Sequence, residues 1–174
     1  MTTTRPRAVL IGPPGSGKST VARALAHALD LPSRDTDTDV EHTAGKPIHE
    51  IFVDDGEPAF RELERRAVST ALTEHPGVLA LGGGAVLDAG TQDALQQYRA
   101  DGGTVVFLDV TLTHAAPRVG FNQSRPLLVG NPRAQWQALM NARRPLYEQL
   151  ADITVLTDDK HPQQVAAHLT DHLR

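Results

Sequence analysis

The sequence predicts an α/β fold in which helices cover both faces of a five-stranded parallel sheet. Short apolar runs without polar alternation recur along the chain, as expected for strands buried on both faces. Segments with helically spaced apolar residues separate these runs, and strands that alternate with helices form parallel sheets. A glycine-rich loop at residues 12–19 joins the first strand to the first helix, which is typical of phosphate-binding α/β proteins.

The first strand is the apolar run at residues 8–11, and an alanine-rich helix follows at residues 18–29. Leu31-Pro32 ends this helix, and the first half of residues 33–39 is a candidate short strand. Asp35, Asp37 and Asp39 alternate within this segment. If that first half is a short strand, their carboxylates share one side and point to a common place.

Residues 40–74 are mostly helical in pattern, with turns at residues 45–47 and 54–56. The longest helix is expected at residues 57–72, because an apolar stripe there faces a strongly charged surface.

The second half of the chain continues the alternation of strands and helices. Strands are expected at residues 78–81, 104–110 and 153–156, and helices at residues 91–100, 113–118, 134–150 and 162–173. Residues 120–133 lack sustained periodicity and contain two glycines and two prolines. A loop of this length within a compact domain is usually functional, so we expect a lid.

The composition limits the classes of protein that need consideration. A chain of 174 residues supports one domain, residues 1–174, with a substantial core. A formal net charge of −4 gives no general attraction to nucleic acid or to anionic membranes, so we expect neither partner. The absence of cysteine excludes disulfides and thiolate catalysis. Without a signal-peptide pattern or a long apolar segment, we expect a cytoplasmic protein.

Residues 12–19, Gly-Pro-Pro-Gly-Ser-Gly-Lys-Ser, match the P-loop pattern. Gly15 and Gly17 permit a backbone whose N–H groups form a nest for phosphate oxygens, and the following helix adds its N-terminal partial charge. Lys18 is expected to reach the β- and γ-phosphates, and the Ser19 hydroxyl to ligate Mg²⁺. The residues expected to bind the nucleotide here are Gly15, Ser16, Gly17, Lys18, Ser19 and Thr20.

Phosphoryl transfer to an alcohol requires a carboxylate that accepts or orients the hydroxyl proton and another that holds the water shell of the metal. Asp35 and Asp37 can divide these tasks, although on spacing alone helix-capping aspartates at a polar strand end are an equal alternative. Asp109 is a second candidate for the metal, because it ends an apolar strand.

Five further segments, in this order, make the chain resemble the shikimate kinase family. They are Asp35-Thr36-Asp37, residues 56–64 (Gly-Glu-Pro-Ala-Phe-Arg-Glu-Leu-Glu), residues 82–86 (Gly-Gly-Gly-Ala-Val), Arg125-Pro126-Leu127-Leu128 and residues 143–147 (Arg-Arg-Pro-Leu-Tyr). The resemblance implies a three-layer P-loop kinase fold with a lid at about 120–133 and a substrate-binding helical region at about 38–74. It also implies an enzyme that uses ATP and Mg²⁺ to phosphorylate the 3-hydroxyl of shikimate, in aromatic amino-acid biosynthesis. We also expect a monomer.

The same resemblance assigns roles around shikimate, a carboxylated triol. Asp37 contacts the reacting hydroxyl, and Arg61 and Arg143 bind the carboxylate. Arg125, on the lid, closes over the phosphates and stabilises the transition state. Phe60 supplies an apolar wall, and Gly82, Gly83 and Gly84 let the backbone approach the substrate ring closely. Glu64 holds Arg61 in place. Arg118 and the loop before Pro162 flank the adenine.

Three points stay open in the sequence. The resemblance favours Asp35, acting through water, over Asp109 as the second metal-site carboxylate. Arg144 lies beside Arg143, so either arginine can face the substrate carboxylate. Alternative functions are a kinase for another small hydroxy acid such as gluconate or for a nucleoside monophosphate, and a nucleotide-dependent regulatory module. The sequence contains no Asn-Lys-x-Asp motif for guanine.

Overall fold

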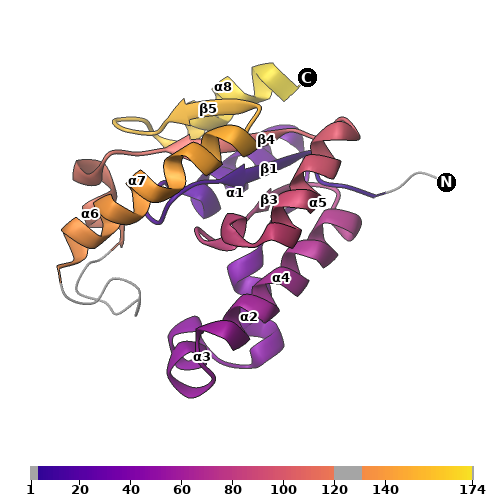
Figure 1. Ribbon diagram of the computed structural model, residues 1–174. Helices are drawn as coiled ribbons and strands as arrows, with labels where there is room; N and C mark the ends of the chain where they lie inside the picture. The colour runs from indigo at the N-terminus through magenta and orange to yellow at the C-terminus, as the bar shows by residue number, and fades with distance from the viewer. Residues whose placement is uncertain (1–3, 120–130, 174) are drawn as a thin grey trace.

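A computed structural model describes residues 4–119 and 131–173, and these form a five-stranded parallel sheet with the order β2-β3-β1-β4-β5 (Figure 1). The strands are β1 (Ala8–Ile11), β2 (Ser33–Asp35), β3 (Val78–Ala80), β4 (Val105–Asp109) and β5 (Ile153–Leu156). The expected α/β architecture with a five-stranded parallel sheet is therefore confirmed.

The central strand β1 has β3 on one side and β4 on the other, so that Val9 pairs with both Leu79 and Val105. From β1 the chain crosses to β2 and returns through β3, and then crosses to β4 and β5 on the opposite side. The strand order therefore reverses beside β1, and ligands in such open sheets bind at the carboxyl ends of the strands near this point. The P-loop follows β1 at that edge.

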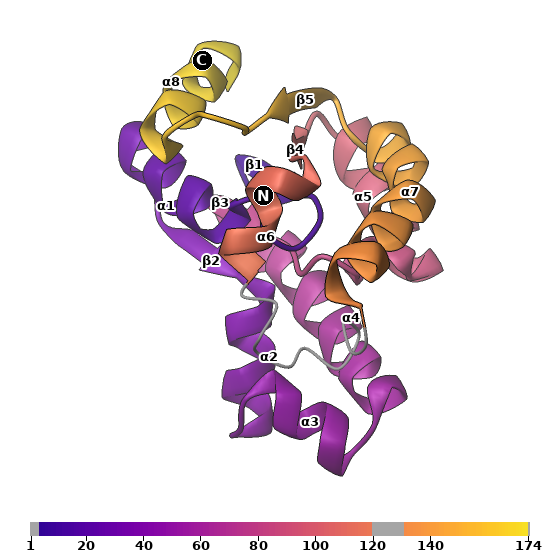
Figure 2. The ribbon, with the colours of Figure 1, turned by 90° about the vertical axis from the view of Figure 1, so that its left-hand side faces the viewer.

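Helices cover both faces of the sheet (Figures 1 and 2). Their bounds are α1 (Lys18–Leu29), α2 (Thr36–Ala44), α3 (Ile48–Asp54), α4 (Glu57–Glu74), a 3₁₀ helix η1 (Ala85–Leu87), α5 (Ala89–Ala100), α6 (Leu112–Val119), α7 (Pro132–Leu150) and α8 (Pro162–Leu173). Alternate residues of β1 point into two cores: Ala8 and Leu10 pack with α1 and α8, while Val9 and Ile11 pack with α4, α5 and α7.

A third, smaller apolar cluster joins the helices between β2 and β3. Val40 of α2, Ile51 of α3 and Phe60 of α4 are its buried members. Figure 2 shows α2 and α3 at the lower end of the molecule, away from β4 and β5. Because α2 begins directly after β2, this helical layer is anchored next to the carboxyl end of the sheet.

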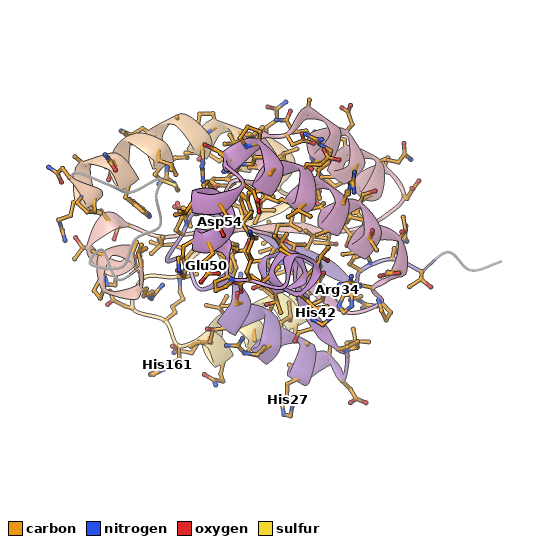
Figure 3. All side chains as sticks on the ribbon, turned by 90° about the horizontal axis from the view of Figure 1, so that it is seen from below. His27, Arg34, His42, Glu50, Asp54 and His161 are labelled. Carbon is orange, nitrogen blue, oxygen red and sulfur yellow. The ribbon has the colours of Figure 1, made fainter. Side chains whose placement is uncertain are left out.

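One local expectation about the aspartates is wrong. Strand β2 ends at Asp35, whose side chain caps α2 by accepting a hydrogen bond from the Asp37 amide at 2.9 Å. Asp37 and Asp39 therefore lie on a helix and do not share one strand face with Asp35. Asp39 Oδ2 instead contacts Nε of Arg34 at 2.6 Å (Arg34 is labelled in Figure 3).

The element boundaries differ slightly from the expected ones. Helix α7 begins at Pro132, because Asn131 caps it through the Ala134 amide and proline is well tolerated in a first turn. Pro132 and Arg133 therefore belong to a helix and not to the expected lid. The rest of that lid, residues 120–130 including Arg125, lies outside the described residues. Within the described ranges, no helix combines the length and apolar character needed to cross a membrane.

Candidate active site

The P-loop wraps the start of α1 at the carboxyl end of β1. Gly15 and Gly17 have φ angles of 85° and 89°, a left-handed conformation that glycine adopts without strain. Lys18 Nζ donates to the carbonyl oxygens of Gly12 at 2.8 Å and Pro13 at 3.0 Å. The loop borders a pocket of about 320 Å³ that is lined by Pro14, Gly15, Gly17, Lys18, Ser19, Thr20, Asp35, Asp37, Leu81, Gly83, Arg118 and Val119.

The donor groups of this loop fit a polyphosphate. Lys18 supplies a positive charge, and α1 begins at the same residue, so the first amides of the helix face the loop. Ser16 is fully buried, and its Oγ has no hydrogen-bond partner within residues 4–119 and 131–173. This hydroxyl is not part of the lining of that pocket, so the Lys18 ammonium and the helix amides are the donors that fit a polyphosphate.

Ser19 and Asp35 lie together at the edge of the pocket. Ser19 Oγ donates to Asp35 Oδ2, while Asp35 Oδ1 accepts the bond from the Asp37 amide. A hydroxyl and a carboxylate are the hard oxygen ligands that suit Mg²⁺, which typically takes one or two protein ligands beside substrate phosphates. The residues present therefore fit Mg²⁺.

Asp109 is placed differently from Asp35. Its Oδ2 lies 2.5 Å from Nη1 of Arg144, and its Oδ1 accepts a bond from the Val110 amide at 2.8 Å. Both oxygens thus have partners on α7 and on its own strand end. Of the two candidate carboxylates, Asp35 is the one that contacts the P-loop helix.

The glycine triplet is the point where several site residues meet. A Cβ atom at Gly82 would lie 2.5 Å from Asp37 Oδ1, and one at Gly84 would lie 2.6 Å from Nη1 of Arg61. A Cβ atom at Gly83 would lie 3.1 Å from Cδ of Pro14 in the P-loop. Because these glycines have no side chains, Asp37, Arg61 and the P-loop can all approach the end of β3.

Arg61 is held by a buried acidic partner on the same helix. Its Nη1 lies 2.7 Å from Oε1 of Glu64, which is only 3% exposed. Burial raises the pKa of Glu64, and the positive charge of Arg61 opposes that shift. The Arg61 guanidinium also lies 5.2 Å from the ring centroid of Phe60, a cation–π distance.

Arg143 is 6% exposed and approaches the same cluster from α7. Burial raises the pKa of Tyr147 and of Glu64, and the positive charge of Arg143 opposes both shifts. Tyr147 Oη donates to the carbonyl oxygen of Gly83 at 2.6 Å, which fixes α7 against the glycine triplet. Tyr147 was not among the expected site residues, although its position one helical turn after Arg143 placed the two on one face.

A second pocket, of about 270 Å³, lies on the other side of the P-loop. Its lining consists of Ser16, Gly17, Thr20, Val21, Arg118, Thr157, Lys160, Pro162 and Val165. Arg118 Nη1 donates to the Gly15 carbonyl at 3.1 Å, so the guanidinium lies directly against the loop. The structure therefore brings Arg118 and Pro162, the two expected adenine-site residues, to one pocket next to the phosphate-binding loop.

The parallel sheet with its P-loop, and an acidic and basic cluster at the same edge, define an enzyme of the P-loop kinase class. The shikimate kinase family model matches residues 14–174 of the chain. A shikimate kinase of Salinispora arenicola is 54% identical over 164 residues, which are 94% of this chain and 95% of that protein. The shikimate kinase of Thermobifida fusca is 50% identical over 169 residues, 97% of this chain and 95% of that one.

The solved structures agree with this result. The shikimate kinase from Acinetobacter baumannii in complex with shikimate matches with a TM-score of 0.90 and 32% identity, over 98% of this chain and 93% of that chain. The chain belongs to the shikimate kinase family.

Proposed function

We propose that this protein transfers the γ-phosphoryl group of ATP to the 3-hydroxyl of shikimate, which yields shikimate 3-phosphate and ADP in aromatic amino-acid biosynthesis. Besides family membership, one structural observation supports the proposal. The glycine triplet joins the two halves of the site, because Gly83 approaches Pro14 of the P-loop while Gly82 and Gly84 approach Asp37 and Arg61. Phosphoryl donor and acceptor would thus meet at one strand end.

On the donor side, the amides of residues 15–20 and the Lys18 ammonium would hold the phosphates, with adenine near Arg118 and Pro162. Ser19, and Asp35 through water, would hold Mg²⁺. A Mg²⁺ ion held there would help to neutralise the negative charge on the phosphates. Lys18, together with Arg125 outside the described residues, would stabilise charge on the group in transfer.

On the acceptor side, Arg61 and Arg143 would bind the shikimate carboxylate, and Phe60 would contact the ring. Asp37 would orient the 3-hydroxyl and accept its proton as the new oxygen–phosphorus bond forms. The bond between the γ-phosphorus and the bridging oxygen breaks at the same step, and ADP leaves with that oxygen. The protein contributes mainly position and charge, because the transfer needs little covalent help.

Glu64 supports this arrangement as a positioning residue. It contacts Arg61 directly, and its electrostatic partners also include Asp37 and Arg143. A single buried carboxylate would thereby hold the cationic cluster in place in the absence of substrate, since buried charges need partners.

A substrate panel tests the proposal. Purified protein with Mg²⁺ and ATP is assayed for ADP release with shikimate, gluconate and several nucleoside monophosphates, and Lys18→Ala serves as the inactive control. We expect turnover with shikimate alone and at least a 100-fold loss in the control, comparable to the loss of a major electrostatic contact in a transition state. Turnover of another acceptor without turnover of shikimate would overturn the proposal, and slow hydrolysis that no acceptor stimulates would favour a regulatory module.

The expected monomeric state and cytoplasmic location are further proposals. Light scattering coupled to size-exclusion chromatography tests the first directly, since a monomer has a mass of 18.7 kDa. A mass of twice that value across the working concentration range would exclude a monomer.

A further inference from the structure

Side chains from outside the P-loop hold three successive carbonyl groups of that loop. Trp136 Nε1 donates to the Pro14 carbonyl at 2.9 Å, and Arg118 Nη1 donates to the Gly15 carbonyl at 3.1 Å. Thr157 Oγ1 donates to the Ser16 carbonyl at 3.2 Å. These three side chains come from α7, α6 and the segment after β5, all far from the loop in sequence. The shape of the loop is therefore set partly by the second half of the chain.

The contact of Trp136 fixes the direction of an amide that the pocket needs. No peptide bond in the described residues is cis, and in a trans peptide the carbonyl and the following N–H point in opposite directions. A Pro14 carbonyl turned towards Trp136 in the core therefore turns the Gly15 N–H away from the core. Gly15 lines the pocket of about 320 Å³ at the P-loop.

The peptide between Pro14 and Gly15 is also easily rotated. The proline ring fixes φ of Pro14 but leaves its ψ free, and Gly15 tolerates a wide range of φ. Rotation of this plane needs only those two angles. The Ser16 N–H donates to the Pro13 carbonyl at 3.2 Å and closes a turn around this peptide, and the indole N–H of Trp136 is the side-chain donor that holds the Pro14 carbonyl.

Trp136 holds its carbonyl from a more firmly fixed position than Thr157 does. It is 1% exposed and packs in the core with Met140 and Tyr147 of the same helix, so its ring has a fixed position. Thr157 Oγ1 also lies within hydrogen-bond distance of the Asp109 carbonyl, at 3.0 Å, and its single hydrogen cannot serve both acceptors at once. The indole N–H, by contrast, donates its single hydrogen to the Pro14 carbonyl.

We propose that Trp136 is a positioning residue for nucleotide binding: its indole N–H holds the Pro14–Gly15 peptide so that the Gly15 N–H is presented to a nucleotide phosphate. The inference rests on the proposed function only in that the P-loop binds a nucleotide. The same contact places the Pro14 ring against Gly83, and so fixes the phosphate loop relative to the glycine triplet.

The rival explanation is that Trp136 only fills the core. The two explanations differ in the atom that matters, because core filling depends on the ring and positioning depends on the N–H. The chain has one tryptophan, so a tryptophan analogue incorporated throughout the protein changes this residue alone. 3-Benzothienylalanine keeps the bicyclic shape and replaces the N–H with sulfur.

The experiment compares wild-type protein with the analogue-labelled protein by calorimetric titration with ADP and Mg²⁺. We expect the dissociation constant to rise about fivefold to tenfold, as loss of one hydrogen bond to a buried carbonyl predicts. In the kinase assay KM for ATP should rise by a similar factor, while KM for shikimate changes less than twofold. An unchanged dissociation constant in the analogue-labelled protein would overturn the inference.

Met140→Ala is the matched control, since Met140 is fully buried one turn further along α7 in the same core. It should lower the melting temperature at least as much as the analogue does, with nucleotide affinity unchanged. Equal losses of affinity in both proteins would assign the effect to core packing and overturn the inference. If the analogue-labelled protein does not fold, Trp136→Phe replaces it in the same comparison. The ADP titration needs no turnover, so a failure of shikimate phosphorylation leaves this test intact.

Discussion

Arg144 Nη1 lies 2.5 Å from Asp109 Oδ2, and this ion pair joins α7 to the end of β4. Each of these two residues was one of two candidates for a role in the site. Arg144 competed with Arg143 for the substrate carboxylate, and Asp109 competed with Asp35 for the metal. Arg144 and Asp109 bind each other, whereas the charge of Arg143 acts on Tyr147 and Asp35 contacts Ser19.

The two arginines of α7 should differ sharply on substitution. Arg143→Ala removes a buried cation from the proposed carboxylate site, so we expect KM for shikimate to rise about 100-fold. Arg144→Ala removes a half-exposed partner of Asp109 and should change that KM less than threefold. Steady-state kinetics with ATP held saturating measure both values. A larger effect at Arg144 would reverse the assignment.

The two candidate metal-site carboxylates can be separated by the dependence of activity on Mg²⁺. Asp35→Asn weakens the only proposed protein carboxylate near Ser19, and the Mg²⁺ concentration for half-maximal activity should rise about tenfold, as loss of a supporting metal partner typically does. Asp109→Asn should leave that concentration unchanged and lower the melting temperature through the lost contact with Arg144. The opposite pattern would place the metal at β4.

Asp37→Asn tests the proposed proton acceptor. The amide keeps the shape of the side chain but cannot accept the hydroxyl proton, so kcat should fall about 1,000-fold, within the usual range for a general base. The dissociation constant for ADP with Mg²⁺ should stay within threefold of the wild-type value. A selective loss of nucleotide binding would instead place Asp37 at the metal.

Gly84→Ala probes the close approach of Arg61 to the strand end. The new Cβ would lie 2.6 Å from Nη1 of Arg61, so the guanidinium must shift relative to Glu64, its buried partner. We expect KM for shikimate to rise about tenfold and the free energy of unfolding to fall by about 1 kcal/mol. Gly90→Ala, in the first turn of α5, is the control, and its KM should match that of the wild type.

His75 should make the stability depend on pH. The residue is buried, its Nε2 lies 3.2 Å from the Val78 carbonyl, and burial lowers its pKa below the usual value of about 6.5. Between those two pKa values the unfolded chain binds more protons than the folded chain. This contribution to stability is therefore complete above pH 6.5 and is lost as the pH falls through the folded pKa.

Urea denaturation at several pH values between 5 and 8 measures the effect. His75→Gln and His75→Phe carry no titrating group, so the free energy of unfolding should fall less steeply towards acid in both variants than in the wild type. If both variants keep the wild-type slope, the pH dependence arises at other residues.

Local patterns were sufficient for most of the fold. The helices at residues 18–29 and 162–173 and the strands at residues 8–11 and 153–156 begin and end as expected, because apolar periodicity, proline and glycine act within a few residues. For the aspartate segment, the local pattern left a shared strand face and a helix cap as alternatives, and the structure shows that Asp35 is a helix cap. Nothing in the alternation of Asp35, Asp37 and Asp39 shows that a helix begins at Thr36, where the Asp35 side chain caps it.

The sequence by itself determined the phosphate loop, the parallel sheet and the family, since these depend on residue types at fixed spacing. Only the tertiary structure shows that Arg143 and Arg144 have different surroundings. Neighbouring residues on a helix differ by about 100° in direction, so one faces Tyr147 and the other faces Asp109. It also decided that Asp35 contacts Ser19 and that Trp136 holds the Pro14 carbonyl 122 residues earlier in the chain. Such contacts depend on how distant elements pack, which spacing along the chain does not specify.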